Sequence, residues 1–500
     1  MFEAVPSLRP WVHPDRAFWV HRPRSQADWD QLAAEYTDTD FTKDEERRPL
    51  HQVFDVVRKG GCVTVVVENR YVDVDYRSEY SSFWSLKFDN QSPFARRFHF
   101  FATNLEEKTL HLLTEEQVES YLGYSIIRPV PHGRVGRTVV KPPPELDGAT
   151  LTLIDDKVSL FGTPLTVRGV PFCEQDKEFL RCAHAAAWIC HYTAARRGNV
   201  GRHSTAEIVE MSPNALSPER ALPSQGLNYN QLQVVFGALA QPAILYGLSA
   251  LPQVVGVEDP VSPDDENSGE ETPAGWWDKR MISIICRYLN SGFPVLVGAD
   301  EHAFVLVGWR RDDEGSVQFI ACDDGVGPYE VIKSPFEHDL APWDSFMIPL
   351  PPKVYLSAES AETRAHEWFR YFAEQVEQLS QFGEELLEGK VVLRTMLRTG
   401  SRYKEEVKRV ARSPQTLQAL RLARLPHWVW VVEAHRPELC KEEKPCVVAA
   451  AVLDSTAFDE KPPVDVLAVL GMVVIYPPDD AAEVLVDGSP TPWESLLKVH

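Results

Sequence analysis

The chain has 500 residues, of which 44% are apolar and 25% are charged, and its formal net charge is −22. This composition predicts a folded globular protein of two or three domains, and the acidic excess argues against nucleic acid as its main partner, because phosphate groups are bound by clustered Lys and Arg side chains. No segment reaches the roughly 18 apolar residues of a membrane helix and the N-terminus has no signal-peptide pattern, so we expect a cytoplasmic protein with no membrane partner.

The first 145 residues are predicted to form an N-terminal α+β domain. Valine-rich sequence favours a buried strand, apolar residues at helical spacing favour helices, and Thr114 followed by Gln117 is typical of a capped helix start. The predicted elements are helices at residues 27–36, 78–88 and 115–122, a strand at 61–68, and two short strands within 124–141 around Pro131-His132-Gly133. Three prolines at 142–144 break the chain and mark the expected boundary.

Residues 146–355 are predicted to form a central domain in which helices are followed by a twisted antiparallel sheet. The predicted elements are short strands at 150–154 and 165–170, helices starting near Cys182 and Asn230, a helix at 277–290, and strands at 295–297, 303–308 and 317–322. Residues 257–275 are acidic and rich in proline, serine and glycine. Such a composition cannot bury enough apolar surface to order itself, so an exposed insertion loop is expected there.

Residues 356–500 are predicted to form a C-terminal α+β domain. One long amphipathic helix is expected over 361–389, because its apolar residues recur at helical spacing. Strands are expected at 428–433, 447–453 and 466–476. The eight cysteines form no CxxC pair and no dense framework, so we expect them to be reduced and expect neither a structural zinc nor any other metal or cofactor.

The segment around Cys182 carries the most chemical information. The alanine-rich sequence that follows it is a strong helix former, so Cys182 is expected in the first turn of a helix. A helix N-terminus and a nearby histidine favour the thiolate, which is the nucleophilic form of cysteine. Gln175, upstream on the loop, could donate a hydrogen bond to an oxyanion alongside the backbone N–H of Cys182.

Two further pieces complete a possible catalytic set. His302 stands at the mouth of an apolar strand, where a rigid element would hold its ring as a general base. Asp323 and Asp324 end the next predicted strand, and one of these carboxylates could accept the other imidazole N–H. The ordinary alternatives stay open: Cys182 as a core residue, His302 as a strand-end histidine, and the acidic pair as part of a turn.

The order Gln, Cys, His, Asp and the local sequences around these residues resemble the papain-like superfamily, and more closely its C39-like peptidase branch. The resemblance covers residues of about 165 to 350. It implies Gln175 as oxyanion donor, Cys182 as nucleophile, His302 as base and Asp323 as the residue that orients His302. The sequence departs from the family where Ala183 replaces the usual glycine and where Asp324 replaces the usual proline, so Asp324 is a second candidate for the orienting role.

These observations predict a cysteine peptidase or a related amide hydrolase, acting on a peptide or protein substrate without a cofactor. The alternative is a catalytically silent papain-like domain that binds a peptide or protein partner in an assembly, and the flanking domains could contact such a partner. His184 is expected to point away from the site in a structural role. Cys190 and His191 are expected to be packing and surface residues.

Overall fold

The computed structural model describes most of the chain. The described residues are 17–37, 48–88, 91–212, 226–248, 251–252, 254–255, 279–299, 302–333, 343–410, 413–441, 444–457, 464–470, 472–476, 483–486 and 492–495. The chain divides into two compact units: residues 1–246 with 293–351, and residues 247–292 with 352–500. The acidic segment 257–275, for which an exposed loop was predicted, lies outside the described residues.

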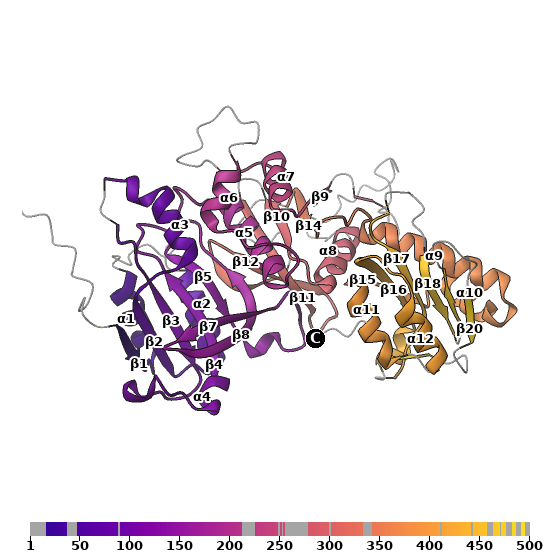
Figure 1. The fold of residues 1–500 in the computed structure, drawn as a ribbon, viewed down its shortest axis with the longest axis horizontal. Coiled ribbons are helices and arrows are strands. Elements are labelled where there is room, and N and C mark those ends of the chain that lie inside the picture. Colours follow the sequence, from indigo (N-terminus) through magenta and orange to yellow (C-terminus); the bar gives the residue numbers. More distant parts are fainter. Residues whose placement is uncertain are drawn as a thin grey trace, which may run out of the picture. The chain divides into compact units, whose positions relative to one another are not determined.

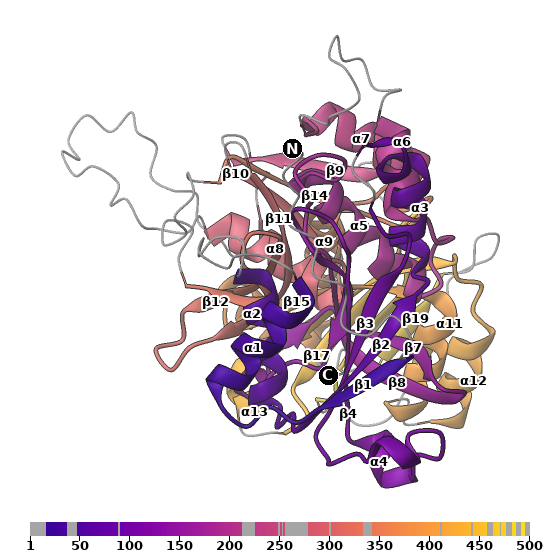
Figure 2. The same ribbon diagram turned by 90° about the vertical axis from the view of Figure 1, so that its left-hand side faces the viewer.

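The first unit contains a large antiparallel sheet in its N-terminal part, which runs through the indigo and purple strands of Figure 2. Its strand order is β1-β2-β3-β4-β5-β8-β7. Its strands are β1 (Phe18–His21), β2 (Thr64–Tyr71), β3 (Ala95–Phe101), β4 (Tyr121–Ile127), β5 (Val135–Val140), β7 (Ile154–Leu160) and β8 (Thr163–Phe172). The central strands β3, β4 and β5 are buried along their whole length, which fits their apolar and β-branched sequence.

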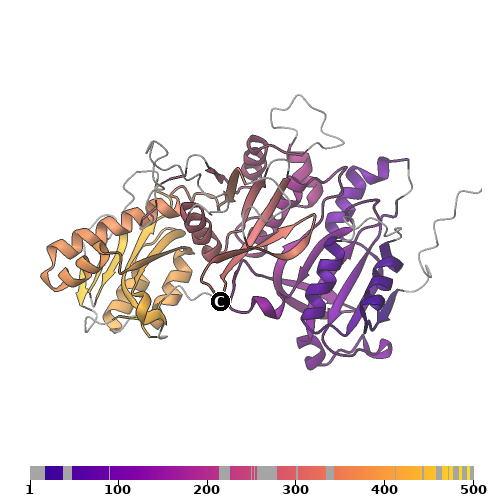
Figure 3. The same cartoon turned by 180° about the vertical axis from the view of Figure 1, so that it is seen from behind.

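The indigo helices α1 (Gln26–Thr37) and α2 (Arg48–Lys59) lie over this sheet (Figure 3). The other helices of this part are α3 (Val74–Ser82) and α4 (Glu115–Glu119). The predicted cap at Thr114 is confirmed, because Thr114 and Gln117 form a reciprocal capping box. The predicted helix over 115–122 is too long, however, since Tyr121 already begins β4 and pairs with Phe101.

A second sheet of the first unit has the order β13-β12-β11-β10-β14-β9, and β6 pairs with β11 at its side. Its strands are β6 (Thr150–Leu151), β9 (Ala243–Gly247), β10 (Val295–Ala299), β11 (His302–Arg311), β12 (Val317–Asp323), β13 (Gly327–Ile332) and β14 (Ser345–Pro349). Helix α5 (Cys182–Arg196) packs against β11 and β8 (Figure 1). Two more helices, α6 (Thr205–Met211) and α7 (Tyr229–Ala238), follow it in the chain. The chain is mixed α+β with antiparallel sheets, as predicted. Strand β6 precedes α5 in the chain and pairs with β11, so this sheet is not built only from strands that follow the helices.

The structure groups the chain differently from the three predicted domains. Strand β8 lies beyond the predicted boundary at residue 145, yet it pairs with β5, so one sheet runs across that point. Tyr329 in β13 ties the second sheet to this junction, because its hydroxyl donates to the Val140 carbonyl at 2.7 Å and accepts from the Val170 N–H at 3.0 Å. The N-terminal sheet and the sheet that carries His302 therefore share one core.

The second unit is built on an antiparallel meander in which β15 to β20 pair in chain order. Its strands are β15 (Val392–Thr399), β16 (Trp428–His435), β17 (Val447–Asp454), β18 (Val464–Val469), β19 (Met472–Ile475) and β20 (Glu483–Val486). Its helices are α8 (Lys279–Ser291), α9 (Ala358–Gln375), α10 (Ser380–Leu387), α11 (Gly400–Glu406), α12 (Pro414–Leu422) and α13 (Pro437–Lys441). Helices α9 and α12 lie on opposite sides of the meander (Figure 1).

Three expectations for this region are wrong. The single helix predicted over 361–389 is divided, because Val376 has an extended backbone that lets α10 fold back on α9 and pack Phe382 against Phe369 at 6.2 Å between ring centroids. The strand predicted over 466–476 is a hairpin of β18 and β19. The cysteines are not all reduced, since Cys440 and Cys446 are joined by a disulfide. Within the described residues, no helix has the length and apolar character to cross a membrane.

Candidate active site

Cys182 is the first residue of α5. The N-terminal N–H groups of a helix lack intrahelical partners and favour negative charge beside them. The Arg181 N–H donates to Nδ1 of His184 at 3.3 Å, so this imidazole closes the helix start. Burial lowers the pKa of His184 to about 4 and keeps the ring neutral. His184 therefore serves the helix cap, while the Cys182 side chain is partly exposed.

The loop before Cys182 is held by a buried carboxylate. Asp176 Oδ1 accepts three backbone N–H groups, from Glu178, Phe179 and Leu180, at 2.7 to 2.9 Å. This pattern folds the chain into a tight turn directly before α5. The position of Cys182 is thus fixed from both sides, by the turn before it and by the helix after it.

The same loop is fastened to the N-terminal sheet at Gln175. Gly133 lies so close that a Cβ atom there would meet the Gln175 carbonyl oxygen at 1.7 Å, and its φ of +60° also favours glycine. Arg128 donates to the carbonyls of Gly133 and Glu174, the second at 2.7 Å. Its guanidinium also forms a buried ion pair with Glu79 at 2.9 Å. The predicted turn at Pro131-His132-Gly133 is therefore part of the support for the loop that carries Gln175.

His302 opens β11, and Asp323 closes the neighbouring strand β12. The antiparallel pairing of these strands brings the two residues together although they are far apart in the chain. Nε2 of His302 lies 3.1 Å from both carboxylate oxygens of Asp323. Asp323 is itself held in place, since its Oδ1 accepts the Gly325 N–H at 2.7 Å.

The Cys182 side chain forms a hydrogen bond with the His302 ring. Burial disfavours a charged ring, but the hydrogen bonds with Asp323 and Cys182 and the nearby carboxylates outweigh it and raise the pKa of His302 to about 11. The site therefore favours an imidazolium next to the thiol.

Asp324 lies behind this pair and is fully buried. Its Oδ1 is 3.6 Å from Nε2 of His302, longer than the two contacts of Asp323. Burial raises the pKa of Asp324 to about 7, while the charge of His302 and a hydrogen bond from Gln175 act in the opposite direction. Among the residues that the structure describes, neither oxygen of Asp324 has a partner at good hydrogen-bond geometry, so the contact from Gln175 is a weak one.

All five candidate residues thus lie in one place: Cys182, His302, Asp323, Asp324 and Gln175. Of the two acidic residues, Asp323 makes the closer contacts with His302. The structure places the Gln175 side chain next to Asp324. Its role as an oxyanion donor stays a prediction.

The expectation that His191 is a surface residue is wrong. Helix α5 is buried on nearly all sides, and His191 is 0% exposed. Its Nδ1 pairs with Gln241 at 2.5 Å, and its Nε2 lies 3.1 Å from Nδ1 of His203. Cys190 is buried as expected.

The sequence did not identify the residues that support the loop. The signal for Asp176 was present, because an Asp at the start of a short polar stretch before a helix commonly accepts backbone N–H groups. Arg128 had no such signal, since its partners Glu79 and Glu174 come from distant parts of the sequence. A third missed group contains His435, Cys440 and Cys446, which lie close enough together to hold a metal ion, as do His302, Asp323 and Asp324.

Comparisons with known proteins add little to this geometry. No protein-family model matches the chain, and a search of curated proteins found no match. Among solved structures, the chain is similar to the crystal structure of UfSP from C. elegans, with 15% sequence identity and a TM-score of 0.22. The match covers 36% of this chain and 33% of the UfSP chain, so this chain spans about a third of the length of UfSP. A likeness this weak carries no argument, and the function is inferred from the site itself.

Proposed function

We propose that the chain is a cysteine peptidase or a related amide hydrolase of the papain-like type, with the C39-like branch as the nearest resemblance. One observation carries the proposal: the imidazole of His302 lies between the thiol of Cys182 and the carboxylate of Asp323. A thiol at a helix start, a base beside it and a group that orients the base are the parts that nucleophilic catalysis requires.

In the proposed reaction, the Cys182 thiolate attacks the carbonyl carbon of a peptide or related amide. The backbone N–H of Cys182 and the amide of Gln175 stabilise the negative charge that forms on the carbonyl oxygen. The C–N bond breaks as the His302 imidazolium gives its proton to the leaving amine. His302 then takes a proton from water as the water attacks the thioester; the C–S bond breaks, the acid leaves, and the Cys182 thiolate and the His302 imidazolium are restored.

Asp323 keeps Nε2 of His302 protonated and holds the ring toward the sulfur in this scheme. The raised pKa of His302 supports a resting state in which its ring is protonated beside the sulfur of Cys182. The proposed substrate is a peptide or protein.

Thiol reactivity tests this proposal before any substrate is known. The folded protein is treated with limiting iodoacetamide over a pH series, and the labelled cysteine is located by peptide mass spectrometry. We expect preferential labelling of Cys182 well below pH 8, because the thiolate reacts and the thiol does not. We expect this preference to vanish in His302→Ala.

The matched control is Cys286→Ser, which removes another partly exposed cysteine that is not in the disulfide and should leave the labelling of Cys182 unchanged. If Cys182 stays unlabelled at every pH while other exposed cysteines react, the hydrolase proposal fails. A domain that binds a peptide or protein without cleaving it would then remain.

A further inference from the structure

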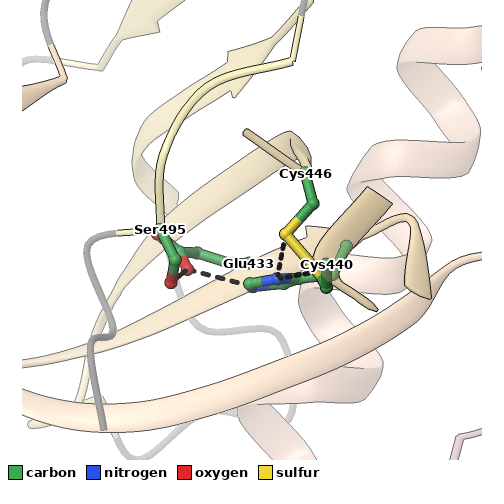
Figure 4. Close-up of a disulfide and its surroundings, with 5 residues drawn as sticks. Glu433, Cys440, Cys446 and Ser495 are labelled. Atoms are coloured by element: carbon green, nitrogen blue, oxygen red, sulfur yellow. Dashed lines mark hydrogen bonds and ion pairs between the residues drawn. A yellow bond between two sulfur atoms is a disulfide. The ribbon is translucent and has the colours of Figure 1, made fainter. Parts of the chain in front are cut away.

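A second cluster of cysteine, histidine and carboxylate groups lies in the C-terminal unit, at the end of β16. Glu433 and His435 are two positions apart on this strand, so their side chains lie on the same face. Nε2 of His435 is 3.0 Å from Oε2 of Glu433. On the other side of the ring, Nδ1 lies 3.6 Å from the sulfur of Cys440 and 3.5 Å from the sulfur of Cys446 (Figure 4).

The carboxylate of Glu433 is held as firmly as a catalytic residue, although the proposed function does not use it. Glu433 is 0% exposed. Its Oε2 also accepts a hydrogen bond from Ser495 at 2.6 Å (Figure 4), and the bridge between Val447 and Trp493 fixes the segment that carries Ser495. A buried carboxylate that accepts one N–H of an imidazole fixes the orientation of the ring and directs the other nitrogen at its target.

That target is a pair of sulfur atoms, which the fold brings together. Cys440 follows β16 in the short helix α13, and Cys446 directly precedes β17. Strands β16 and β17 are antiparallel neighbours, so the end of β16 lies beside the start of β17 and the two cysteines are brought together there. Cys446 is buried and Cys440 is exposed, which leaves one side of the cluster open to solvent.

The distances match those of a zinc site. With Zn–N near 2.0–2.1 Å and Zn–S near 2.3 Å, tetrahedral geometry puts a nitrogen and a sulfur ligand about 3.6 Å apart. Both observed distances from Nδ1 of His435 to sulfur have this value within about 0.1 Å. The pairing of a zinc-binding histidine with a buried carboxylate is also the usual arrangement around such sites.

We propose that this cluster is a redox-controlled zinc site, in which the reduced Cys440 and Cys446 bind Zn²⁺ together with Nδ1 of His435. Glu433 and Ser495 position the histidine, and a water molecule takes the fourth place on the exposed side. The disulfide is the metal-free, oxidised form of the same site. The proposed zinc site is independent of the proposed hydrolase function.

The interconversion balances with a dithiol reductant. The reductant transfers two electrons and two protons to the disulfide, gives two thiols, and is itself oxidised to a disulfide. Zn²⁺ then displaces the two thiol protons, which are released to solvent. The sulfurs must separate to about 3.8 Å, the distance between two sulfur ligands of one tetrahedral zinc. Cys440 can make this movement because it is exposed.

Metal titration of the full chain tests the proposal. The background is Cys182→Ser, because a reactive thiol beside His302 could itself bind Zn²⁺. The protein is reduced with a phosphine, desalted without oxygen, and titrated with Zn²⁺ against a chromophoric chelator. Co²⁺ replaces Zn²⁺ in a parallel titration, since thiolate ligation gives it a sulfur-to-metal charge-transfer band. We expect one ion per chain, this band, and at least 100-fold weaker binding before reduction.

Three variants separate ligation from folding. His435→Gln keeps both cysteines and the disulfide, and we expect it to weaken Zn²⁺ binding by about 100-fold; Glu433→Gln should weaken it by about 10-fold or more. Cys286→Ser is the matched control and should bind as the background protein does. Absence of the cobalt band in the reduced protein, or unchanged affinity in His435→Gln, overturns the proposal and leaves a structural disulfide.

Discussion

Two clusters in this chain use the same chemical groups and arrive at different chemistry. In both, Nε2 of a histidine faces a buried carboxylate, and a cysteine sulfur contacts the same ring. In the first unit the carboxylate of Asp323 comes from the neighbouring strand, and one thiol stands alone at a helix start. In the second unit Glu433 is on the same strand as His435, and two sulfurs are within reach.

The number of sulfurs is what separates them. A single thiol beside a protonated imidazole has no second sulfur with which to form a disulfide, so it can react with the carbonyl carbon of a substrate. Two sulfurs beside an imidazole react with each other or share a metal ion. A histidine next to a carboxylate is therefore not by itself a sign of catalysis, because the same pair serves equally well to fix a metal ligand.

Alkylation should show the largest difference between the clusters. In the unreduced protein we expect iodoacetamide to label Cys182 and to leave Cys440 and Cys446 unlabelled, because bonded sulfurs are not nucleophiles. After reduction the exposed Cys440 should become labelled, and added Zn²⁺ should protect it again. Peptide mass spectrometry measures all three states. Labelling of Cys440 in air-oxidised, unreduced protein would show that the two clusters do not differ in thiol reactivity.

Removing the carboxylate should have a smaller effect. In Asp323→Asn the imidazolium of His302 loses its main charged partner, so the thiolate is less favoured. We expect the alkylation rate of Cys182 at pH 6 to fall by about 10- to 100-fold. The same measurement in Glu433→Gln should give the wild-type rate for Cys182. Equal rates in all three proteins would mean that Asp323 does not set the state of His302.

The charge on His302 should also appear in stability. Burial opposes the charged ring, but Asp323 and Cys182 raise the pKa of His302 to about 11. A raised folded-state pKa stabilises the fold fully below the unfolded value of about 6.5, and this contribution is lost as the pH rises through about 11. We therefore expect the excess of the wild-type free energy of unfolding over that of His302→Gln to shrink by several kcal/mol between pH 6 and pH 10, at about 1.4 kcal/mol for each pH unit between the two pKa values. Urea unfolding measures it, and a constant difference would contradict the ion pair.

Substitution of Asp324 should have the smallest effect, and it should stabilise the protein, whereas substitution of His302 destabilises it. Burial raises its pKa to about 7, so its neutral form stabilises the fold at low pH and this contribution is lost as the pH rises through 7. Asp324→Asn removes the buried charge that forms above pH 7. The free energy of unfolding of this variant is measured relative to wild type at each pH. We expect this difference to be about 1 kcal/mol more favourable to the variant at pH 8 than at pH 5. If the variant is instead less stable relative to wild type at pH 8 than at pH 5, Asp324 acts as a charged residue beside His302.

Local signals in the sequence predicted the parts of the site that depend on neighbouring residues. The helix start at Cys182, the strand start at His302 and the strand end at Asp323 follow from propensity and alternation, and the structure has them there. The cap at Thr114 was equally local.

The features that escaped prediction depend on distant residues. The break at Val376 exists because Phe382 packs back on Phe369, which helical periodicity cannot show. The cysteines at 440 and 446 meet only because β16 and β17 are paired. The choice between Asp323 and Asp324 depended on the orientation of two adjacent side chains relative to a ring on another strand.

The pairing of β5 with β8 has a consequence for how this protein can be inherited. Backbone groups of β8 near the Cys182 loop find their partners in Val139 and Val140, and the hydroxyl of Tyr329 fastens both strands to the sheet of His302. A gene segment that encoded residues 146–355 alone would leave this strand as an open, apolar edge prone to aggregation. We therefore expect the part of the chain that carries Cys182 to fold and to be inherited together with the first 145 residues.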